Sequence, residues 1–238
     1  KWDQMNASLL QGTRNTRDLG VLLPGGKPCR LLRSDHLAAL TDADIRLLQD
    51  WGIGCILDLR RPDEQLRQPT PAALQNAVVP VPIDNTPLFT VRRMDPTFRL
   101  GELYLHMLHV QGPRFVRAVH LAADSLRRGQ GVLFHCSAGK DRTGLLAALL
   151  LLCAGVPRAE VIGDYLRTKD MLAGAPELDV ATIPPNTAPD FYKALLGCEA
   201  EAMERALDEW DKLGGAARWL ENAGADPADI AFWSFQNT

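Results

Sequence analysis

The sequence predicts an α/β fold in which a mainly parallel central sheet is flanked by helices. Short apolar segments alternate with longer segments of helical periodicity along most of the chain. Of the 238 residues 46% are hydrophobic, which is enough for a substantial core in one large domain or two small ones. No linker, repeat or low-complexity segment divides the sequence, so we expect a single domain over residues 1–238.

The first third of the chain is expected to form a hairpin, a helix and a strand. A Pro-Gly-Gly-Lys segment at 24–27 is a turn signal, and the segments on either side of it suit the two strands of a hairpin. Thr41 precedes a helix that carries acidic residues in its first turn and ends at Gly52. The apolar residues 55–59 then predict a short buried strand.

The middle of the chain continues this alternation. We expect a strand at 78–83, a helical segment around 85–110, and a further helix that Pro113 opens. An apolar strand ends at His135, and a long apolar helix follows the loop after it. The C-terminal part is predicted to be helical, interrupted by a long loop at 171–189 that is rich in Pro, Ala and Gly.

The loop HCSAGKDRTG, residues 135–144, is suited to binding a phosphate dianion. A sharp turn between a strand and a helix directs several backbone N–H groups into one concavity, and the helix N-terminus adds its own unpaired donors. Gly139 permits the turn, and the planar guanidinium of Arg142 can bind two phosphate oxygens at once. Cys136 lies where an anion would bind, so the same field favours its thiolate and makes it a nucleophile.

This loop resembles the signature loop of cysteine-dependent protein tyrosine phosphatases, in which five residues separate a Cys from an Arg. It is most similar to the loops of bacterial tyrosine and lipid phosphatases of broad specificity, and similar to those of phosphoinositide phosphatases. The resemblance implies a tyrosine-phosphatase-like fold, a lid-like insertion around 85–110, and hydrolysis of phosphomonoesters through a cysteinyl-phosphate intermediate without metal or cofactor. It makes Cys136 the nucleophile and Arg142 the phosphate clamp, with Thr143 helping the thiolate leave. It also implies backbone donors from Ser137, Ala138, Gly139, Lys140 and Asp141.

Two aspartates are candidates for the general acid that protonates the leaving oxygen. By the resemblance, Asp84 matches a loop from which the family draws its acid, although a turn-forming role before Pro87 is equally compatible with the sequence. Asp141 lies inside the signature loop, where Arg142 and the helix donors favour its charged form and make it a poorer proton donor. The resemblance nevertheless implies that the loop aspartate shares this work, so both candidates stay open.

Two further segments resemble the same family. Arg17 and Asp18 belong to an Arg-Asp-Leu-Gly segment and could contact the site directly, but we favour a structural ion pair because most Arg–Asp neighbours only organise the chain. Asp58 and Arg60 follow a predicted strand, at the edge of the sheet where ligands bind in parallel sheets. For these two residues we favour a role in bracing the loop.

The resemblance implies that the substrates are phosphotyrosine in proteins, with phosphoserine or phosphothreonine, or phosphoinositides, or both classes. Lys140 is expected at the rim of the site, where its charge would suit polyanionic headgroups. Two alternatives keep the same loop. One is a phosphate-binding module without catalysis, and the other is an arsenate reductase, which needs resolving cysteines that Cys153 and Cys198 are poorly placed to supply.

Composition excludes several other functions. The net charge of −3 argues against nonspecific nucleic-acid binding. No apolar run approaches the ~20 residues that span a bilayer, so we expect no stable membrane insertion. The five cysteines have no metal-binding spacing and form no disulfide framework, which suits a compartment where thiols survive. Localisation stays open between a cytoplasmic protein and one secreted after removal of an N-terminal segment, since the chain begins at Lys1 rather than Met.

Overall fold

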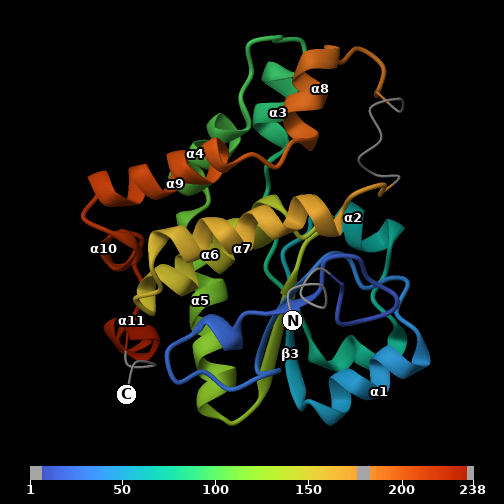
Figure 1. The fold of residues 1–238 in the computed structure, drawn as a ribbon, viewed down its shortest axis with the longest axis vertical. Helices are drawn as coiled ribbons and strands as arrows, with labels where there is room; N and C mark the ends of the chain where they lie inside the picture. The colour runs from blue at the N-terminus through green and yellow to red at the C-terminus, as the bar shows by residue number, and fades with distance from the viewer. Residues whose placement is uncertain (1–6, 176–182, 235–238) are drawn as a thin grey trace.

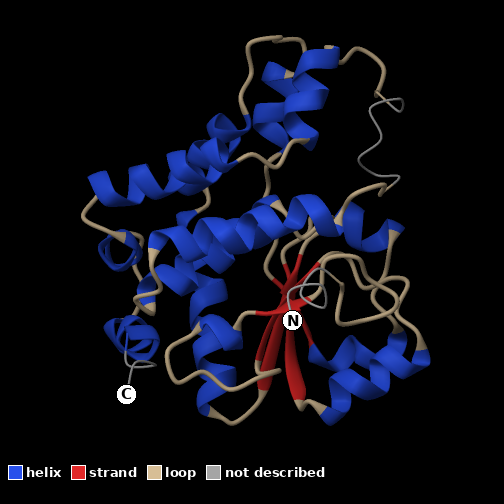
Figure 2. Ribbon diagram, viewed as in Figure 1, coloured by secondary structure: helices blue, strands red, loops and turns tan. Residues whose placement is uncertain are grey.

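A five-stranded sheet lies at the centre of the computed structural model, which describes residues 7–175 and 183–234 (Figure 1 and Figure 2). Its strand order is β1-β2-β5-β3-β4, and every neighbouring pair is parallel except β1 and β2. The predicted fold, a mainly parallel sheet flanked by helices, is therefore confirmed. The strands are β1 (Arg17–Asp18), β2 (Leu31–Ser34), β3 (Ile53–Asp58), β4 (Val78–Pro80) and β5 (Gly131–His135).

Helices make up most of the remaining described chain. In order they are α1 (Asp42–Asp50), α2 (Pro62–Arg67), α3 (Thr86–Arg92), α4 (Leu100–Val110), α5 (Gly112–Arg127), α6 (Asp141–Cys153), α7 (Arg158–Met171), α8 (Pro189–Leu196), α9 (Ala200–Lys212), α10 (Ala216–Asn222) and α11 (Pro227–Ser234). Within the described ranges, none of them combines the length and the apolar character needed to cross a membrane.

The helices cover both faces of the sheet, in keeping with the nearly continuous apolar runs of its central strands. On one face α1 packs against β3, and its Leu48 joins Leu32, Ile56 and Leu133 in a small core. On the other face α5 and α6 pack against the sheet, and α7, α10 and α11 pack in turn against these two helices. This second face holds the larger core of the protein.

Helix α6 is the most completely buried helix of the larger core. Apart from Asp141 and Leu152, all of its residues are buried. Its sequence explains this burial, because a helix that is apolar on all sides is stable only when other elements surround it. The loop that leads into α6 is therefore attached to two immobile elements, the central strand β5 and this helix.

The N-terminal hairpin differs from the prediction. β2 pairs with β1, whereas residues 20–22 form a 3-10 turn in place of the expected strand. The carboxylate of Asp18 accepts hydrogen bonds from the backbone N–H groups of Gly20, at 2.7 Å, and Cys29, at 2.6 Å, and this holds the chain in a turn. The strand expected at 78–83 is also shorter and ends at Pro80, although the N–H of Val81 still donates to the carbonyl oxygen of Asp58 at 2.9 Å.

The predicted helical segment around 85–110 consists of α3 and α4, and each packs against a helix from the C-terminal part. α4 packs along α9. α3 lies beside α8, where the rings of Phe89 and Phe191 are 6.3 Å apart (Figure 1). A lid function for this segment stays a prediction. Of the long loop expected at 171–189, residues 176–182 lie outside the described residues.

Candidate active site

The signature loop connects β5, the central strand, directly to α6. β5 ends at His135, which pairs in register with the last residue of each neighbouring strand. Gly139 has a φ of 66°, and a Cβ atom there would lie 2.5 Å from the carbonyl oxygen of Ser34, so only glycine fits this turn. Cys136 begins the loop and Arg142 lies in the first turn of α6, and their exposed fractions are only 2% and 5%.

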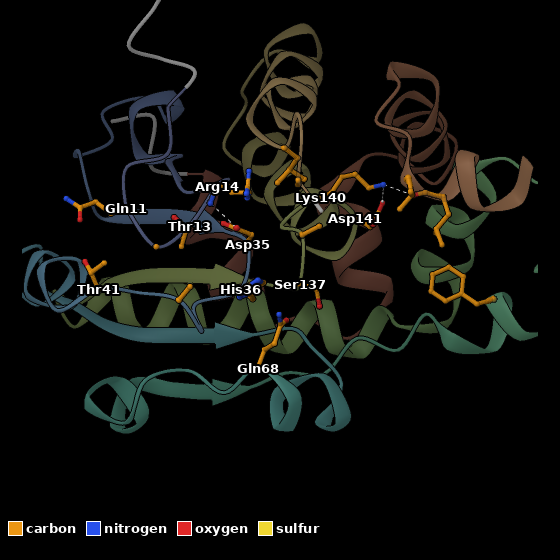
Figure 3. A pocket seen from close by; sticks show the side chains of 18 residues that line it. Gln11, Thr13, Arg14, Asp35, His36, Thr41, Gln68, Ser137, Lys140 and Asp141 are labelled. Atoms are coloured by element: carbon orange, nitrogen blue, oxygen red, sulfur yellow. Dashed lines mark hydrogen bonds and ion pairs between the residues drawn. The ribbon is translucent and has the colours of Figure 1, made fainter. Parts of the chain in front are cut away.

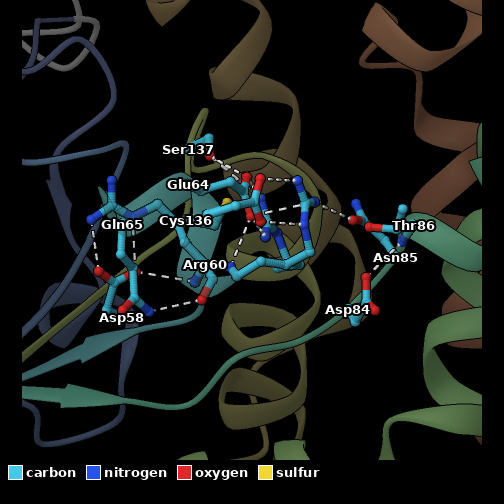
Figure 4. A network of polar contacts seen from close by, with 12 residues as sticks. Asp58, Arg60, Glu64, Gln65, Asp84, Asn85, Thr86, Cys136 and Ser137 are labelled. Atoms are coloured by element: carbon cyan, nitrogen blue, oxygen red, sulfur yellow. Dashed lines mark hydrogen bonds and ion pairs between the residues drawn. The ribbon is translucent and has the colours of Figure 1, made fainter. Parts of the chain in front are cut away.

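Glu64 of α2 holds the guanidinium of Arg142, a contact that the sequence analysis did not predict (Figure 4). Arg142 Nη1 donates to Glu64 Oε2 at 2.7 Å, and Nη2 donates to Oε1 at 2.8 Å. Ser137 Oγ also donates to Oε1, at 2.7 Å. The bidentate pair fixes the plane of the guanidinium, and its Nε–H stays available for another acceptor.

Both charges of this pair are stabilised in spite of their burial. Burial raises the pKa of Glu64, but the hydrogen bonds and charge of Arg142 outweigh burial and lower this pKa to about 2. Burial lowers the pKa of Arg142, but Glu64, together with Cys136 and Asp141, raises it above its ordinary value. Glu64 is the last residue of the DLRRPDE segment. This segment was recognised as similar to the family, but the sequence alone could not identify Arg142 as the partner of Glu64.

A second group of polar residues holds the signature loop from behind. Asn15 Nδ2 donates to the carbonyl oxygens of Ala138, at 2.9 Å, and Gly139, at 3.1 Å. Arg33 Nη2 donates to the same Gly139 oxygen at 2.7 Å, while its Nη1 pairs with Asp164 at 2.5 Å. Because these loop carbonyls are bound on the outside, the turn is held with its N–H groups free for the concavity.

Arg17 takes part in this group, and the expected ion pair between Arg17 and Asp18 is wrong. Arg17 Nε donates to Asp164 Oδ1 at 2.7 Å, and both side chains are 2% exposed. Asp18, the next residue of β1, points to the other face, where its partners among the described residues are the backbone N–H groups of Gly20 and Cys29. The structural role favoured for Arg17 agrees with this geometry, but its partner comes from α7, 147 positions away.

Asp58 and Arg60 brace the end of β3, as expected. Arg60 Nη2 donates to Asp58 Oδ2 at 2.7 Å, and Arg60 Nη1 donates to the carbonyl oxygen of Gln68 at 2.8 Å. His135 Nε2 lies 3.7 Å from Asp58 Oδ2. Burial, only partly opposed by Asp58, lowers the pKa of His135 to about 4, so the residue before Cys136 is neutral at ordinary pH.

The geometry of this loop agrees with comparisons between the chain and known proteins. The sequence profile of the tyrosine phosphatase family matches residues 8–234. The chain belongs to the tyrosine phosphatase family. A tyrosine-protein phosphatase of Nostoc commune is 35% identical to this phosphatase over 150 residues, which cover 61% of the chain and 50% of that protein. The chain therefore spans about half the length of this relative.

Two further proteins are similar to this phosphatase. The triple specificity protein phosphatase PtpB of Mycobacterium tuberculosis is 31% identical over 265 aligned positions, which cover 93% of the chain and 95% of PtpB. The crystal structure of TpbA from P. aeruginosa in complex with pTyr covers 71% of the chain and 86% of TpbA, with 15% identity and a TM-score of 0.36. This structural overlap is low, so membership of the family rests on sequence.

The two candidate acids of the phosphatase have different surroundings. Asp141 Oδ1 accepts a hydrogen bond from the hydroxyl of Tyr104 at 2.8 Å, and this hydroxyl lies 2.8 Å from that of Tyr165. The carboxylate of Asp84 instead accepts the backbone N–H of Thr86 at 2.8 Å, at the start of α3. In Figure 4 Asp84 lies apart from the group around Cys136. Asp141 lines the cavity beside the loop, and Asp84 is not among the residues described as lining it.

Lys140 differs from the expectation that it adds charge at the rim. Its side chain is 2% exposed, and its Nζ donates to the carbonyl oxygens of Leu195, at 2.6 Å, and Gly197, at 2.8 Å. These carbonyls end α8, where unpaired acceptors attract a cation. Lys140 Nζ also lies 3.5 Å from Asp141 Oδ1. The ammonium group of Lys140 therefore has its contacts inside the protein and not at the rim of the site.

A cavity of about 640 Å³ extends along one side of the signature loop (Figure 3). Ser137, Ala138, Lys140 and Asp141 of the loop line it, together with residues 11–14, 35 and 36 from the N-terminal part and several side chains near α8. A cavity of this volume accommodates a small-molecule ligand or a phosphorylated side chain with its neighbours. The substrate-binding roles predicted for the loop residues stay predictions, and the cavity is the space in which they would act.

Proposed function

We propose that this phosphatase hydrolyses phosphomonoesters through a cysteinyl-phosphate intermediate on Cys136. The observation that carries the proposal is that Cys136 and Arg142 share one glycine turn between a buried strand and a buried helix. In this proposal the Nε–H of Arg142 and the N–H groups of residues 137–141 bind the phosphate oxygens. Fixed donors of this kind stabilise the charge that redistributes over those oxygens in the transition state.

In the first step the thiolate of Cys136 attacks phosphorus. The S–P bond forms, the bond from phosphorus to the leaving oxygen breaks, and Asp141 or Asp84 gives its proton to that oxygen. In the second step water attacks the phosphorus, the same carboxylate accepts a proton from the water, and the S–P bond breaks. The buried hydroxyl of Thr143 has no partner among the described residues, so it is available to the departing thiolate.

The proposed substrates are phosphotyrosine, with phosphoserine and phosphothreonine, and phosphoinositides. Membership of the tyrosine phosphatase family supports the first class. The name of the M. tuberculosis relative, a triple specificity protein phosphatase, supports a broader range. The cavity of about 640 Å³ supports substrates larger than a single phosphorylated side chain.

Turnover of p-nitrophenyl phosphate tests the proposed chemistry. We expect Cys136→Ser to abolish turnover while a phosphotyrosine peptide still binds, and we expect acid-quenched parent protein to carry one phosphoryl group on the peptide that contains Cys136. Comparable turnover by Cys136→Ser and the parent would overturn the mechanism. To assign the acid, pH–rate profiles of Asp84→Asn and Asp141→Asn are compared, because the variant that lacks the proton donor loses the decline on the alkaline side.

The geometry does not favour an arsenate reductase. Such an enzyme needs a second cysteine that attacks the first, and attack requires a thiolate. Burial raises the pKa of Cys153 to about 12 and also raises that of Cys198. Their exposed fractions are 8% and 6%, so neither is suited to act as a resolving thiol.

A further inference from the structure

Residues 11–14 form one wall of the cavity beside the signature loop, and two carboxylates fix this wall in place. Asp44 accepts hydrogen bonds from the backbone N–H groups of residues 11 and 12, at 2.7 and 2.8 Å. Asp35 accepts the N–H groups of residues 14 and 15, both at 2.9 Å. The side chain of Asn15 then binds the loop itself. The wall is therefore held at a set position relative to the phosphate site.

Arg14 is the cation that this wall presents. It is exposed, lines the cavity, and has no hydrogen bond or ion pair from its side chain to any described residue. Asp35 lies next to it, but both oxygens of that carboxylate are engaged by the backbone N–H groups. In Figure 3 Arg14 and Asp35 lie together, between Gln11 on one side and Lys140 on the other.

His36 lies next to this wall and supplies a second side chain with a polar atom that has no partner among the described residues. Its backbone N–H donates to the carbonyl oxygen of Ser137 at 2.9 Å, so the residue is attached directly to the signature loop. Its Nδ1 is buried and has no hydrogen-bond partner among the described residues, although a buried polar atom of this kind is normally paired. Its side chain lines the cavity that Arg14 lines.

We propose that Arg14 and His36 form a subsite for a second anionic group of the substrate, and that this substrate is a small polyol with more than one phosphate, such as a phosphoinositide headgroup. The proposal rests on the proposed function, since the first phosphate occupies the signature loop. Lys140, the loop cation that the sequence suggested for this task, is bound to the end of α8. Arg14 is thus the unpaired cation that the wall offers.

The polar residues around Arg14 suit a polyol, whereas Phe89, Leu195 and Leu196 line another part of the same cavity. Besides Arg14 and His36, the cavity is lined by Gln11, Thr41 and Gln68, all exposed and able to bind hydroxyl groups. Asp35 and Asp141 also line it, but backbone N–H groups bind the first and Tyr104 the second. A ring that carries hydroxyls and phosphates can bind both the cation Arg14 and the hydroxyl-binding side chains. A phosphopeptide would use only the cation, to bind an acidic residue beside its phosphorylated residue.

The test compares kcat/KM for three substrates: p-nitrophenyl phosphate, a soluble inositol bisphosphate, and a phosphotyrosine peptide with an aspartate beside the phosphotyrosine. We expect Arg14→Gln to lower the ratio of inositol bisphosphate to p-nitrophenyl phosphate about tenfold, because a hydrogen bond to a charged group is lost. Arg14→Lys should retain part of the ratio, and His36→Ala should lower it less. Arg46→Gln is the matched control, since it removes an exposed arginine of α1 that is not among the cavity-lining residues.

Each outcome decides between the alternatives. A ratio that Arg14→Gln leaves unchanged overturns the subsite. A loss confined to the acidic peptide overturns the polyol and assigns the subsite to a protein substrate. Calorimetric binding of inositol bisphosphate to Cys136→Ser, with and without Arg14→Gln, measures the subsite without turnover. If the parent protein does not hydrolyse p-nitrophenyl phosphate, the proposed function is contradicted. The difference in inositol bisphosphate affinity between Cys136→Ser with and without Arg14→Gln still tests the subsite.

Discussion

Two clusters of arginine and carboxylate contact the signature loop, and they perform different tasks with the same chemistry. In the first, Glu64 binds Arg142, the guanidinium that is proposed to contact phosphate. In the second, Asp164 binds Arg17 and Arg33, and Arg33 in turn binds a loop carbonyl. The first cluster orients a reactive side chain beside a cavity, whereas the second, fully buried, holds the backbone that shapes the phosphate cradle.

The two clusters differ in how deeply their carboxylates are buried, and this difference matches their different roles. Glu64 is 12% exposed and lies next to open space, so its loss is expected to change activity more than folding. Asp164 is 2% exposed and neutralises two arginines that no water reaches, so its loss is expected to change folding first. Four predictions test this division, beginning with the largest effect.

Replacement of Asp164 by alanine should destabilise the fold by roughly 3–5 kcal/mol, because it leaves Arg17 and Arg33 buried without their counter-charge. Chemical denaturation measures the free energy of unfolding. Asp208→Ala is the control, since Asp208 pairs with Arg158 at the surface and should contribute about 1 kcal/mol or less. Equal effects of the two substitutions would contradict a structural role for the buried cluster.

Replacement of Glu64 by glutamine should lower kcat/KM for p-nitrophenyl phosphate by about a hundredfold. The neutral amide keeps the shape but weakens the hold on Arg142, and a misplaced catalytic group costs activity of this order. Asp63→Asn, one residue earlier on α2 and 55% exposed, should have little effect. A large loss of stability with normal kcat/KM would reverse the roles assigned to the two clusters.

Acid should weaken both clusters over the same range of pH. Asp164 has a pKa of about 2 against an ordinary 3.8, because the two arginines outweigh its burial, and Glu64 has a pKa of about 2 against 4.5. Since folding lowers both values, the stability that these groups contribute is present above about pH 4 and is lost as the pH falls toward 2. Denaturation midpoints measured from pH 5 to about pH 2 should fall steeply in the parent and less in Asp164→Asn.

The smallest effect concerns Asp141. Burial raises the pKa of Tyr104 well above its ordinary value, so its hydroxyl stays a donor to the Asp141 carboxylate. Tyr104→Phe removes this hydrogen bond, so the alkaline limb of the pH–rate profile should move to higher pH. Lys140, Arg142, Tyr165 and Cys198 also face this carboxylate, and all of them stay in place.

Tyr165→Phe is the control for this experiment, because its hydroxyl is hydrogen-bonded to Tyr104 and not to Asp141, so its removal should shift the profile less. An unchanged profile in Tyr104→Phe would argue that Asp141 does not donate the proton. The role would then pass to Asp84, the other candidate.

The sequence by itself determined the strands β3 and β5, helix α6 and the loop between β5 and α6. These features are local: an apolar run, a glycine at φ 66° and the spacing of Cys136 and Arg142 all lie within one short segment. Such patterns depend on near neighbours in the chain and can be recognised without knowing the fold. The bracing of β3 by Asp58 and Arg60, only two positions apart, was predicted for the same reason.

Only the tertiary structure decided which charged groups meet. Arg142 and Glu64 are 78 positions apart, Arg17 and Asp164 are 147 apart, and Lys140 reaches carbonyls about 55 positions away. The sequence suggested Asp18 as the partner of Arg17 and the rim as the place of Lys140, and both expectations were wrong. A buried charge must find a counter-charge or a set of acceptors, but the order of the strands and the packing of the helices select which one it finds.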